Sequence, residues 1–199
     1  SIRGYGCKNT SNKHICKAVA RSIMPIVQSS AAFQQRGFIK GRQMADNVLI
    51  LDTYSRIYSN LYKQYGNSVL AFFDFANAFP FVCVSWIYTV PRVLGAPRGL
   101  QQFVQSLYYQ CDTYMKVNGS LSFLCTVKSG ILQGCPLVAL LFVLAMEPFV
   151  RLFHNHIDSK SLGHTCLCAD AIGVVLKTWW DLPIVLKQKL NWLSKLPAF

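Results

Sequence analysis

Two aspartates of this chain lie in short apolar segments that are typical of β-strands, and this placement restricts the fold more than any other feature. Asp74 follows the run Leu-Ala-Phe-Phe, and Asp170 lies within Cys-Leu-Cys-Ala-Asp-Ala-Ile. Only 8 of the 199 residues are acidic, so two of the few carboxylates occupy segments that a protein normally buries. An isolated buried carboxylate costs several kcal/mol unless a cation or several hydrogen-bond donors compensate its charge.

The two acidic segments allow two interpretations. If the strands are neighbours, the carboxylates converge on one point and form a site for a hard cation such as Mg²⁺ or Mn²⁺, which suits phosphoryl or nucleotidyl transfer. Alternatively, each aspartate caps a turn or accepts backbone hydrogen bonds. The acids alone leave both interpretations open.

The composition narrows the class of protein. Hydrophobic residues make up 52% of the chain and include 13 Phe and 9 Tyr, which excludes intrinsic disorder. The net charge of +12 favours a polyanionic partner, although a basic subunit of a larger protein assembly would have the same charge. The mean hydropathy of +0.29 predicts that another chain, a nucleic acid or a membrane covers part of the surface.

Apolar periodicity and turn residues predict one α+β domain. A central strand is expected over residues 68–75, a hairpin around Asn118-Gly119, and a second hairpin over 165–177 with Asp170 at its tip. Because the longest apolar stretch has 11 residues, from Pro136 to Met146, it predicts a buried helix and no transmembrane helix. The other predicted helices cover residues 12–28, 44–65, 84–94, 99–110 and 182–196.

The eight cysteines are interpreted as reduced thiols, because several lie in apolar runs and no secretory signal is visible. This predicts an intracellular protein. His164, Cys166 and Cys168 are close enough in sequence to suggest a zinc site, but buried thiols are the preferred interpretation because no second CxxC pair lies nearby.

Five motifs in order resemble the fingers and palm of a reverse transcriptase, of the kind encoded by non-LTR (LINE-type) retroelements and related to group II intron enzymes. They cover nearly the whole chain. The matching positions are Arg3 with Lys8-Asn9-Thr10; Gln35, Gly37, Phe38, Gly41 and Arg42 with Asp46-Asn47; Phe73-Asp74 with Ala78-Phe79; Gly130, Gln133, Gly134, Pro136 and Leu137; and Cys168-Ala169-Asp170-Ala171.

The resemblance implies a fingers–palm polymerase fold, with an antiparallel palm sheet packed on helices. Residues 1–67 would form a fingers-like segment and residues 68–199 a palm-like segment without a thumb. It implies RNA-directed DNA polymerisation with an RNA template and a DNA primer, and a nuclear location if this is a retroelement enzyme. Asp74 and Asp170 would be the catalytic metal ligands for two Mg²⁺ or Mn²⁺ ions.

Further roles are implied for residues around these acids. Arg3 would face the triphosphate, Gln133 and Gly134 would lie along the nucleotide, and Phe79 would exclude a ribose 2′-hydroxyl. Lys40 and Arg42 would contact nucleic acid. Residues read on their own allow Phe79 to be a core residue and Arg3 a frayed terminus.

The sequence departs from the family pattern where a second aspartate is expected, because Ala171 stands there. Cys168 replaces an aromatic residue, Val138 a serine, and Gly4 a proline. We therefore expect impaired or absent catalysis, since a metal ligand and the thumb that holds the primer–template are missing.

Three functions remain open at this point. The first is an RNA-directed DNA polymerase, and the second is a catalytically dead relative that serves as a structural or RNA-binding subunit of a larger complex. The second predicts that the apolar helices near Ile87 and Leu144 are buried against partner chains. The third, a membrane-bound subunit with palm-like motifs, rests only on the apolar composition.

Overall fold

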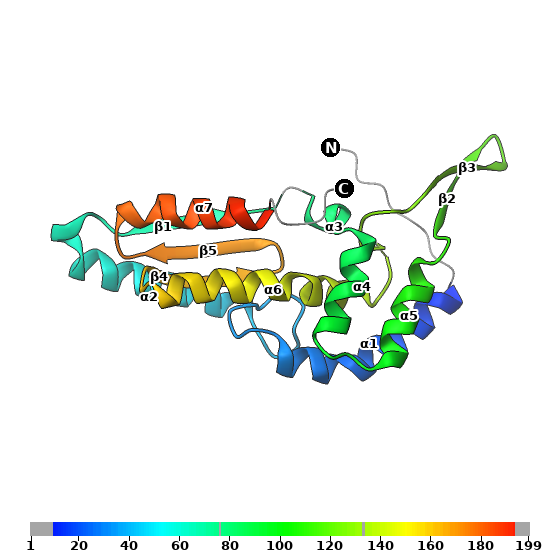
Figure 1. Cartoon of the computed structure of the whole chain (residues 1–199), viewed down its shortest axis with the longest axis horizontal. Helices are drawn as coiled ribbons and strands as arrows, with labels where there is room; N and C mark the ends of the chain where they lie inside the picture. Colours follow the sequence, from blue (N-terminus) through cyan, green and yellow to red (C-terminus); the bar gives the residue numbers. More distant parts are fainter. Residues whose placement is uncertain (1–9, 76, 133, 194–199) are drawn as a thin grey trace. The chain divides into compact units, whose positions relative to one another are not determined.

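A computed structural model of the chain describes residues 10–75, 77–132 and 134–193 (Figure 1). The chain divides into two compact units. One, here called the sheet unit, comprises Ile23–Ala76 and Met146–Ala198; the other, here called the ribbon unit, comprises Ser1–Ser22, Asn77–Ala145 and residue 199. The observed mixture of helices with antiparallel sheet agrees with the α+β class expected from the sequence.

The sheet unit is built on three antiparallel strands in the order β1-β5-β4. These are β1 (Val69–Phe73), β5 (Ala171–Leu176) and β4 (Gly163–Cys168). Strands β4 and β5 form the predicted hairpin, with Cys168 paired to Ala171 across the turn. The prediction of a central strand near residue 70 is wrong, because β1 is an edge strand of the described sheet and Phe72 is 70% exposed. An unbroken apolar run does not distinguish an edge strand from a central one.

Helices cover both faces of this sheet. On one face, Leu51 and Tyr58 of α2 (Met44–Leu61) form a cluster with Cys166 of β4 and Val175 of β5. On the other face, His154 of α6 (Val138–Ser159) hydrogen-bonds Thr165 of β4 at 3.1 Å. Alternation along the strand explains this, since neighbouring residues point to opposite faces. The unit also contains η1 (Lys63–Tyr65), η2 (Trp179–Asp181) and α7 (Leu182–Leu193).

The ribbon unit combines short helices with a two-stranded sheet. Helices α4 (Val84–Val93) and α5 (Arg98–Tyr108) pack together, with Ile87, Val104 and Tyr108 buried. Strands β2 (Asp112–Val117) and β3 (Ser120–Thr126) form the predicted hairpin, in which Asn118 and Gly119 both have positive φ. This geometry is what an Asn-Gly turn provides. A single turn of helix, α3 (Ala78–Phe81), begins the unit's second segment.

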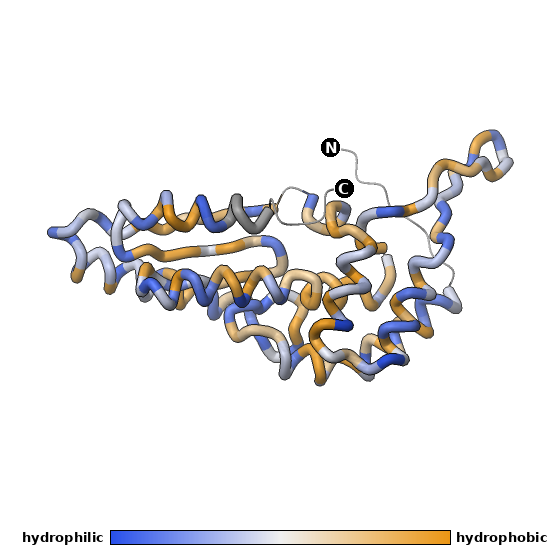
Figure 2. Tube along the Cα trace, viewed as in Figure 1, coloured by the Kyte–Doolittle hydropathy of each residue, from blue (hydrophilic) through white to orange (hydrophobic). Residues whose placement is uncertain are grey.

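Two long helices, α1 (Thr10–Ser30) and α6, each contain one of the points at which the chain passes between the units. In α1 the side chains of Cys16, Ala20, Ile23 and Val27 are buried, whereas Ile15 is 53% exposed. Helix α6 continues through Pro148 to Ser159, well past the apolar stretch, because an internal proline removes one hydrogen bond without ending a well-packed helix. Orange marks the hydrophobic residues along β5 and α6 in Figure 2.

Helix α6 is also the one described helix that is long and apolar enough to cross a membrane. Since 61% of its most apolar window is buried inside the protein, this is weak evidence for a membrane span and agrees with the expected buried helix. Ile87 is 1% exposed and Leu144 8% exposed within this single chain. The chain's own residues therefore cover these two side chains, and packing of the helices against partner chains stays a prediction.

Candidate functional site

Asp74 and Asp170 lie at the same edge of the three-stranded sheet. Strand β1 ends at Phe73, which pairs with Ile172 of β5, so the antiparallel register brings Asp74 level with Ala171. Asp170 directly precedes Ala171 in the turn between β4 and β5. Two segments that are almost a hundred residues apart in sequence therefore present their carboxylates at one edge.

The burial of these acids differs from the expectation. Asp74 is exposed and Asp170 is half-buried. The premise that both carboxylates are buried in strands is wrong, because Asp74 follows the end of β1 and Asp170 lies in the turn between β4 and β5. The feature relevant to cation binding is therefore the common position of the two carboxylates at one sheet edge, and not the cost of desolvating them.

A cavity of about 300 Å³ opens beside this edge. Its lining combines the apolar side chains of Met44, Val48 and Phe72 with Asp74 and Ala171. Helix α2 covers β4 and β5 more fully than β1, which leaves this hollow beside the edge strand. The cavity places an exposed carboxylate at the end of an apolar groove.

Cys168 also lines this cavity, and the pKa of its thiol depends on the charge of Asp170. Burial raises the pKa of the Cys168 thiol, and the negative charge of Asp170 raises it further. The thiol is therefore close enough to the Asp170 carboxylate for their charges to interact. Because a raised pKa keeps the thiol neutral, Cys168 behaves as an uncharged side chain in the position where the family has an aromatic one.

The turn that carries Asp170 is held by the buried side chain of Gln35. Its Oε1 accepts hydrogen bonds from the Ala169 N–H at 2.9 Å and the Gly37 N–H at 2.8 Å. Its Nε2 donates to the Ala169 carbonyl at 3.1 Å. Ala169 has a φ of 57°, an unusual conformation for a residue with a side chain, and Gln35 pairs both of its backbone groups.

Gly37 allows the loop to approach this turn. A Cβ at position 37 would lie 2.2 Å from the Ala169 nitrogen, so no other residue fits without displacing the turn. The Arg36 N–H donates to the Leu167 carbonyl at 2.9 Å, and the Leu167 N–H donates to the Gln34 carbonyl at 2.8 Å. We call residues 34–37 the turn clamp.

Asn47 and Arg36 support the turn clamp from α2. Asn47 donates through Nδ2 to the Leu167 carbonyl at 2.9 Å and accepts from Arg36 Nε at 2.6 Å. Arg36 also pairs with Asp46 at 3.2 Å. The sequence motif contained Gln35 and Asn47 but gave them no role. In the sequence, only their position as polar residues inside an apolar, glycine-containing segment indicates that they form buried hydrogen bonds.

The two basic residues predicted to contact nucleic acid differ in their surroundings. Arg42 donates to the carbonyls of Gln28, Ala31, Ala32 and Gln35, so its guanidinium stabilises the end of α1 and the loop that follows. Burial and the nearby Arg36 lower its pKa. Lys40 is exposed. Nucleic-acid contact by either residue stays a prediction.

The residues predicted to bind the nucleotide belong to the ribbon unit. Phe79 stacks on Phe142, with ring centroids 4.2 Å apart, and its carbonyl accepts a hydrogen bond from Ile131. This is the packing role that the sequence also allowed, and exclusion of a 2′-hydroxyl stays a prediction. Gly134 is exposed and has a φ of 85°. Arg3 and Gln133 lie outside the described residues.

The alternative zinc site near His164 finds no support in the described part of the chain. His164 stacks on Tyr54 with ring centroids 3.8 Å apart, and Cys166 is buried in the cluster with Leu51. Among residues 10–75, 77–132 and 134–193 there is no group of three or more His, Cys, Asp or Glu side chains that could hold a metal ion. The interpretation as a buried thiol fits Cys166, whereas Cys168 is only half-buried.

Comparison with known proteins connects this geometry to a family. The family model described as reverse transcriptase (RNA-dependent DNA polymerase) matches residues 1–197. The retrovirus-related Pol polyprotein from the type-2 retrotransposable element R2DM of Drosophila melanogaster is 29% identical over 164 residues, covering 81% of this chain and 15% of the relative. The 149 kDa protein of transposon TX1 from Xenopus laevis is 27% identical over 184 residues, covering 92% of this chain and 13% of the relative.

A solved structure gives the same fold. Apo telomerase from Candida tropicalis, truncated from its C-terminal domain, matches with a TM-score of 0.62 and 10% identity. The match covers 92% of this chain and 40% of the telomerase chain. The chain thus spans less than a sixth of the two curated relatives and less than half of the solved one.

Proposed function

Because the chain belongs to the reverse transcriptase family, we propose that its sheet edge is a nucleotidyl-transfer site that is weakened by the loss of one carboxylate. The substrates would be an RNA template, a DNA primer and deoxynucleoside triphosphates. The observation that supports this most directly is the arrangement of Asp74, Asp170 and Ala171 at one sheet edge, with a side chain too short to bind a cation at the third position.

The residues at this edge fit a divalent cation, although they supply one carboxylate fewer than the family pattern. Carboxylate oxygens are the ligands that Mg²⁺ and Mn²⁺ prefer, and Mg²⁺ commonly takes only one or two carboxylates together with substrate phosphates. Asp74 and Asp170 supply two. The missing third carboxylate would lower cation affinity, so binding would depend more strongly on the triphosphate.

The protein's own side chains would have different roles at this edge. When bound, the cation would favour ionisation of the primer 3′-hydroxyl and neutralise charge on the phosphates. Asp74 is exposed at the end of β1 and can turn toward a ligand, while the turn clamp fixes the backbone of Ala169, directly before Asp170. Phe79 would exclude ribonucleotides, and Arg3, Gln133 and Gly134 would contact the nucleotide.

A second candidate function is favoured by the same alanine. An RNA-binding or structural subunit derived from a reverse transcriptase would retain the fold and the turn clamp while tolerating Ala171. The two functions differ in whether restoring the carboxylate restores chemistry.

The test is primer extension by the full chain on an RNA template, with Mg²⁺ and with Mn²⁺, comparing the unaltered protein with Ala171→Asp. Since Ala171 is exposed, an aspartate fits there without disturbing the core. We expect Ala171→Asp to extend the primer at least about 100-fold faster, the usual effect of one charge-stabilising group at a reaction centre. Adding Asp74→Asn should abolish the gain, whereas Asp52→Asn, on the exposed surface of α2, should not.

A Mn²⁺ titration followed by electron paramagnetic resonance separates binding from chemistry. Tighter Mn²⁺ binding together with faster extension supports the polymerase function. Tighter binding without any product would favour the RNA-binding subunit, and unchanged binding would contradict a cation site at this edge.

A further inference from the structure

We propose that one face of the β2–β3 ribbon is a binding surface for single-stranded nucleic acid, on which bases stack against Tyr114 and Phe123 beside Lys116. This surface belongs to the ribbon unit, whereas the two carboxylates belong to the sheet unit. It is therefore additional to the proposed catalytic site.

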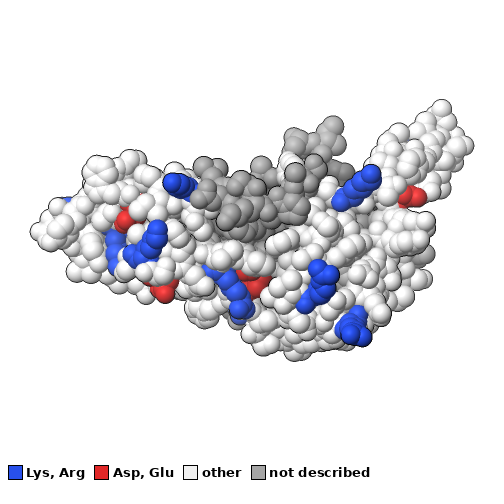
Figure 3. All heavy atoms as spheres, in the orientation of Figure 1, with Lys and Arg blue, Asp and Glu red and all other residues white. Residues whose placement is uncertain are grey.

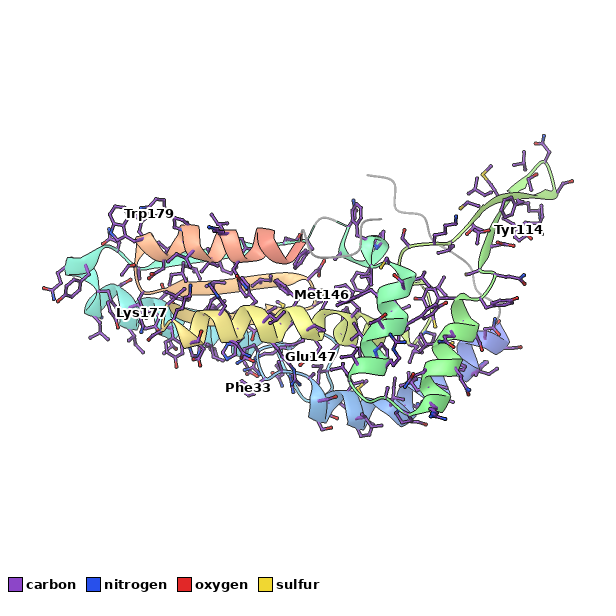
Figure 4. All side chains as sticks on the ribbon, in the orientation of Figure 1. Phe33, Tyr114, Met146, Glu147, Lys177 and Trp179 are labelled. Atoms are coloured by element: carbon purple, nitrogen blue, oxygen red, sulfur yellow. The ribbon has the colours of Figure 1, made fainter. Side chains whose placement is uncertain are left out.

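The ribbon is exposed along its whole length. Every residue of β3 is exposed, as is every residue of β2 except the half-buried Thr113. Figure 4 shows Tyr114 projecting from this ribbon. An isolated two-stranded hairpin is marginally stable in water, and exposed apolar patches of this kind commonly mark an interaction site.

The register assigns the ribbon's side chains to two chemically different faces. Tyr114 pairs with Phe123, and Lys116 pairs with Leu121, so these four residues share one face. The opposite face carries no aromatic ring and no charge; its residues beyond the register shift at Thr113/Tyr114 are Met115, Val117, Ser120 and Ser122. The first of these two faces is here called the aromatic face.

The two rings of the aromatic face remain accessible. Tyr114 is 55% exposed and Phe123 is 58% exposed. Their centroids are 5.9 Å apart and their planes meet at 76°, so neither ring is stacked flat on the other. Each ring therefore offers surface to a planar partner, and an unpaired nucleobase is such a partner because every base has a π-face.

Charge favours a polyanion over a protein as the occupant. Asp112 is the one acid among the described residues of the ribbon unit, and its carboxylate accepts a hydrogen bond from Thr126 Oγ1 at 2.7 Å. The described residues of the same unit include seven basic ones: Lys13, Lys17, Arg21, Arg92, Arg98, Lys116 and Lys128. Blue spheres outnumber red ones on the face of the molecule seen in Figure 3. Asp112 lies two residues before Tyr114 on β2 and therefore on the same face, where Lys116 offsets its charge. Aromatic rings beside a cation are the combination that binds single strands without reading their sequence.

The proposal is tested by fluorescence anisotropy with fluorescein-labelled oligo(U) and oligo(dT) of about 12 nucleotides, a length within the usual site sizes. The variant is Tyr114→Leu with Phe123→Leu, which removes the rings but keeps apolar bulk on the aromatic face. We expect affinity to fall between about 5-fold and 150-fold, the range for losing stacking on one base. The matched control, Met115→Ala with Val117→Ala on the opposite face, should stay within about twofold.

Lys116→Gln tests the phosphate contact separately. It should reduce the slope of log affinity against log salt concentration by about 0.7, the value for one phosphate of a single strand. The leucine variant should bind a duplex of the same length as tightly as the unaltered protein does, because the paired bases of a duplex are not available for stacking.

Three results would overturn the proposal. They are unchanged single-strand affinity in the leucine variant, equal weakening by both pairs of substitutions, and an equal loss of duplex and single-strand affinity in the leucine variant. A difference between oligo(U) and oligo(dT) would show which sugar the surface prefers. These outcomes are independent of the primer-extension result with Ala171→Asp, so failure of one proposal is distinguishable from failure of the other.

Discussion

The two units of this chain differ sharply in how they use charge and burial. The sheet unit holds seven of the 8 acidic residues and buries most of β4 and β5. The ribbon unit holds one acid and nine of the 20 basic residues, and its two strands are almost entirely exposed. The contrast suggests a division of labour, with cation binding in the first unit and contact with a polyanion in the second.

The two units should also differ in how well they tolerate substitutions. The largest expected difference in the free energy of unfolding is for a pair of glycines. Gly37→Ala would drive a methyl group into the backbone of Ala169, so we expect the free energy of unfolding to fall by about 3 kcal/mol or more. Gly99→Ala, in α5 of the ribbon unit, meets no atom within 4 Å and should raise stability by up to about 1 kcal/mol. Urea unfolding followed by circular dichroism measures both. Similar losses for the two variants would contradict the contrast.

A pair of glutamines should give an intermediate effect. Gln35→Leu keeps the volume but leaves the N–H and C=O of Ala169 without their partner, which should cost about 2–3 kcal/mol. The control is Gln101→Leu in the ribbon unit, where one hydrogen bond to the Ala96 carbonyl is lost at a half-buried position and about 1 kcal/mol is expected. The same urea titrations apply. If Gln35→Leu proved as mild as the control, the turn would not depend on this side chain.

The smallest expected effect is a loss of folding stability at alkaline pH. Burial raises the pKa of the Cys166 thiol from its ordinary 9.0 to about 11. The folded state therefore retains the proton longer than the unfolded state, so this stabilisation is complete below pH 9 and is lost as the pH rises through about 11. Over that interval the unaltered protein should lose about 2 kcal/mol more than Cys166→Ala.

The control for this pH profile is Cys125→Ala, since Cys125 is an exposed thiol of the ribbon. Its stability should follow the unaltered protein across the same interval. Parallel pH profiles for the unaltered protein and Cys166→Ala would show that the thiol does not titrate as its burial implies.

Local sequence signals predicted the hairpins well. Asn118-Gly119 indicated the ribbon turn directly, and alternating apolar residues around Asp170 indicated the second hairpin. The positions of the two catalytic candidates at one edge could be expected only through the assumption that their strands are neighbours. The family resemblance supplied that assumption, and the comparisons confirm the family.

The rest depended on contacts between residues far apart in sequence. The exposure of Asp74 follows from the edge position of β1, which no local pattern specifies. The role of Gln35 follows from hydrogen bonds to a residue 134 positions later. Burial of Ile87 and Leu144 within the chain likewise depends on the tertiary fold, and composition alone favoured a partner chain.

The hydrogen bonds of the turn clamp impose an order on how this protein can mature. During translation Gln35 is synthesised before Ala169. Its side-chain amide therefore lacks its native hydrogen-bond partner until 133 intervening residues have been added. Closing so long a loop carries an entropic cost that only late-formed contacts repay. The geometry around Asp170 is therefore completed near the end of translation of this segment, and a nascent chain that stops before residue 169 has nothing for the clamp to hold.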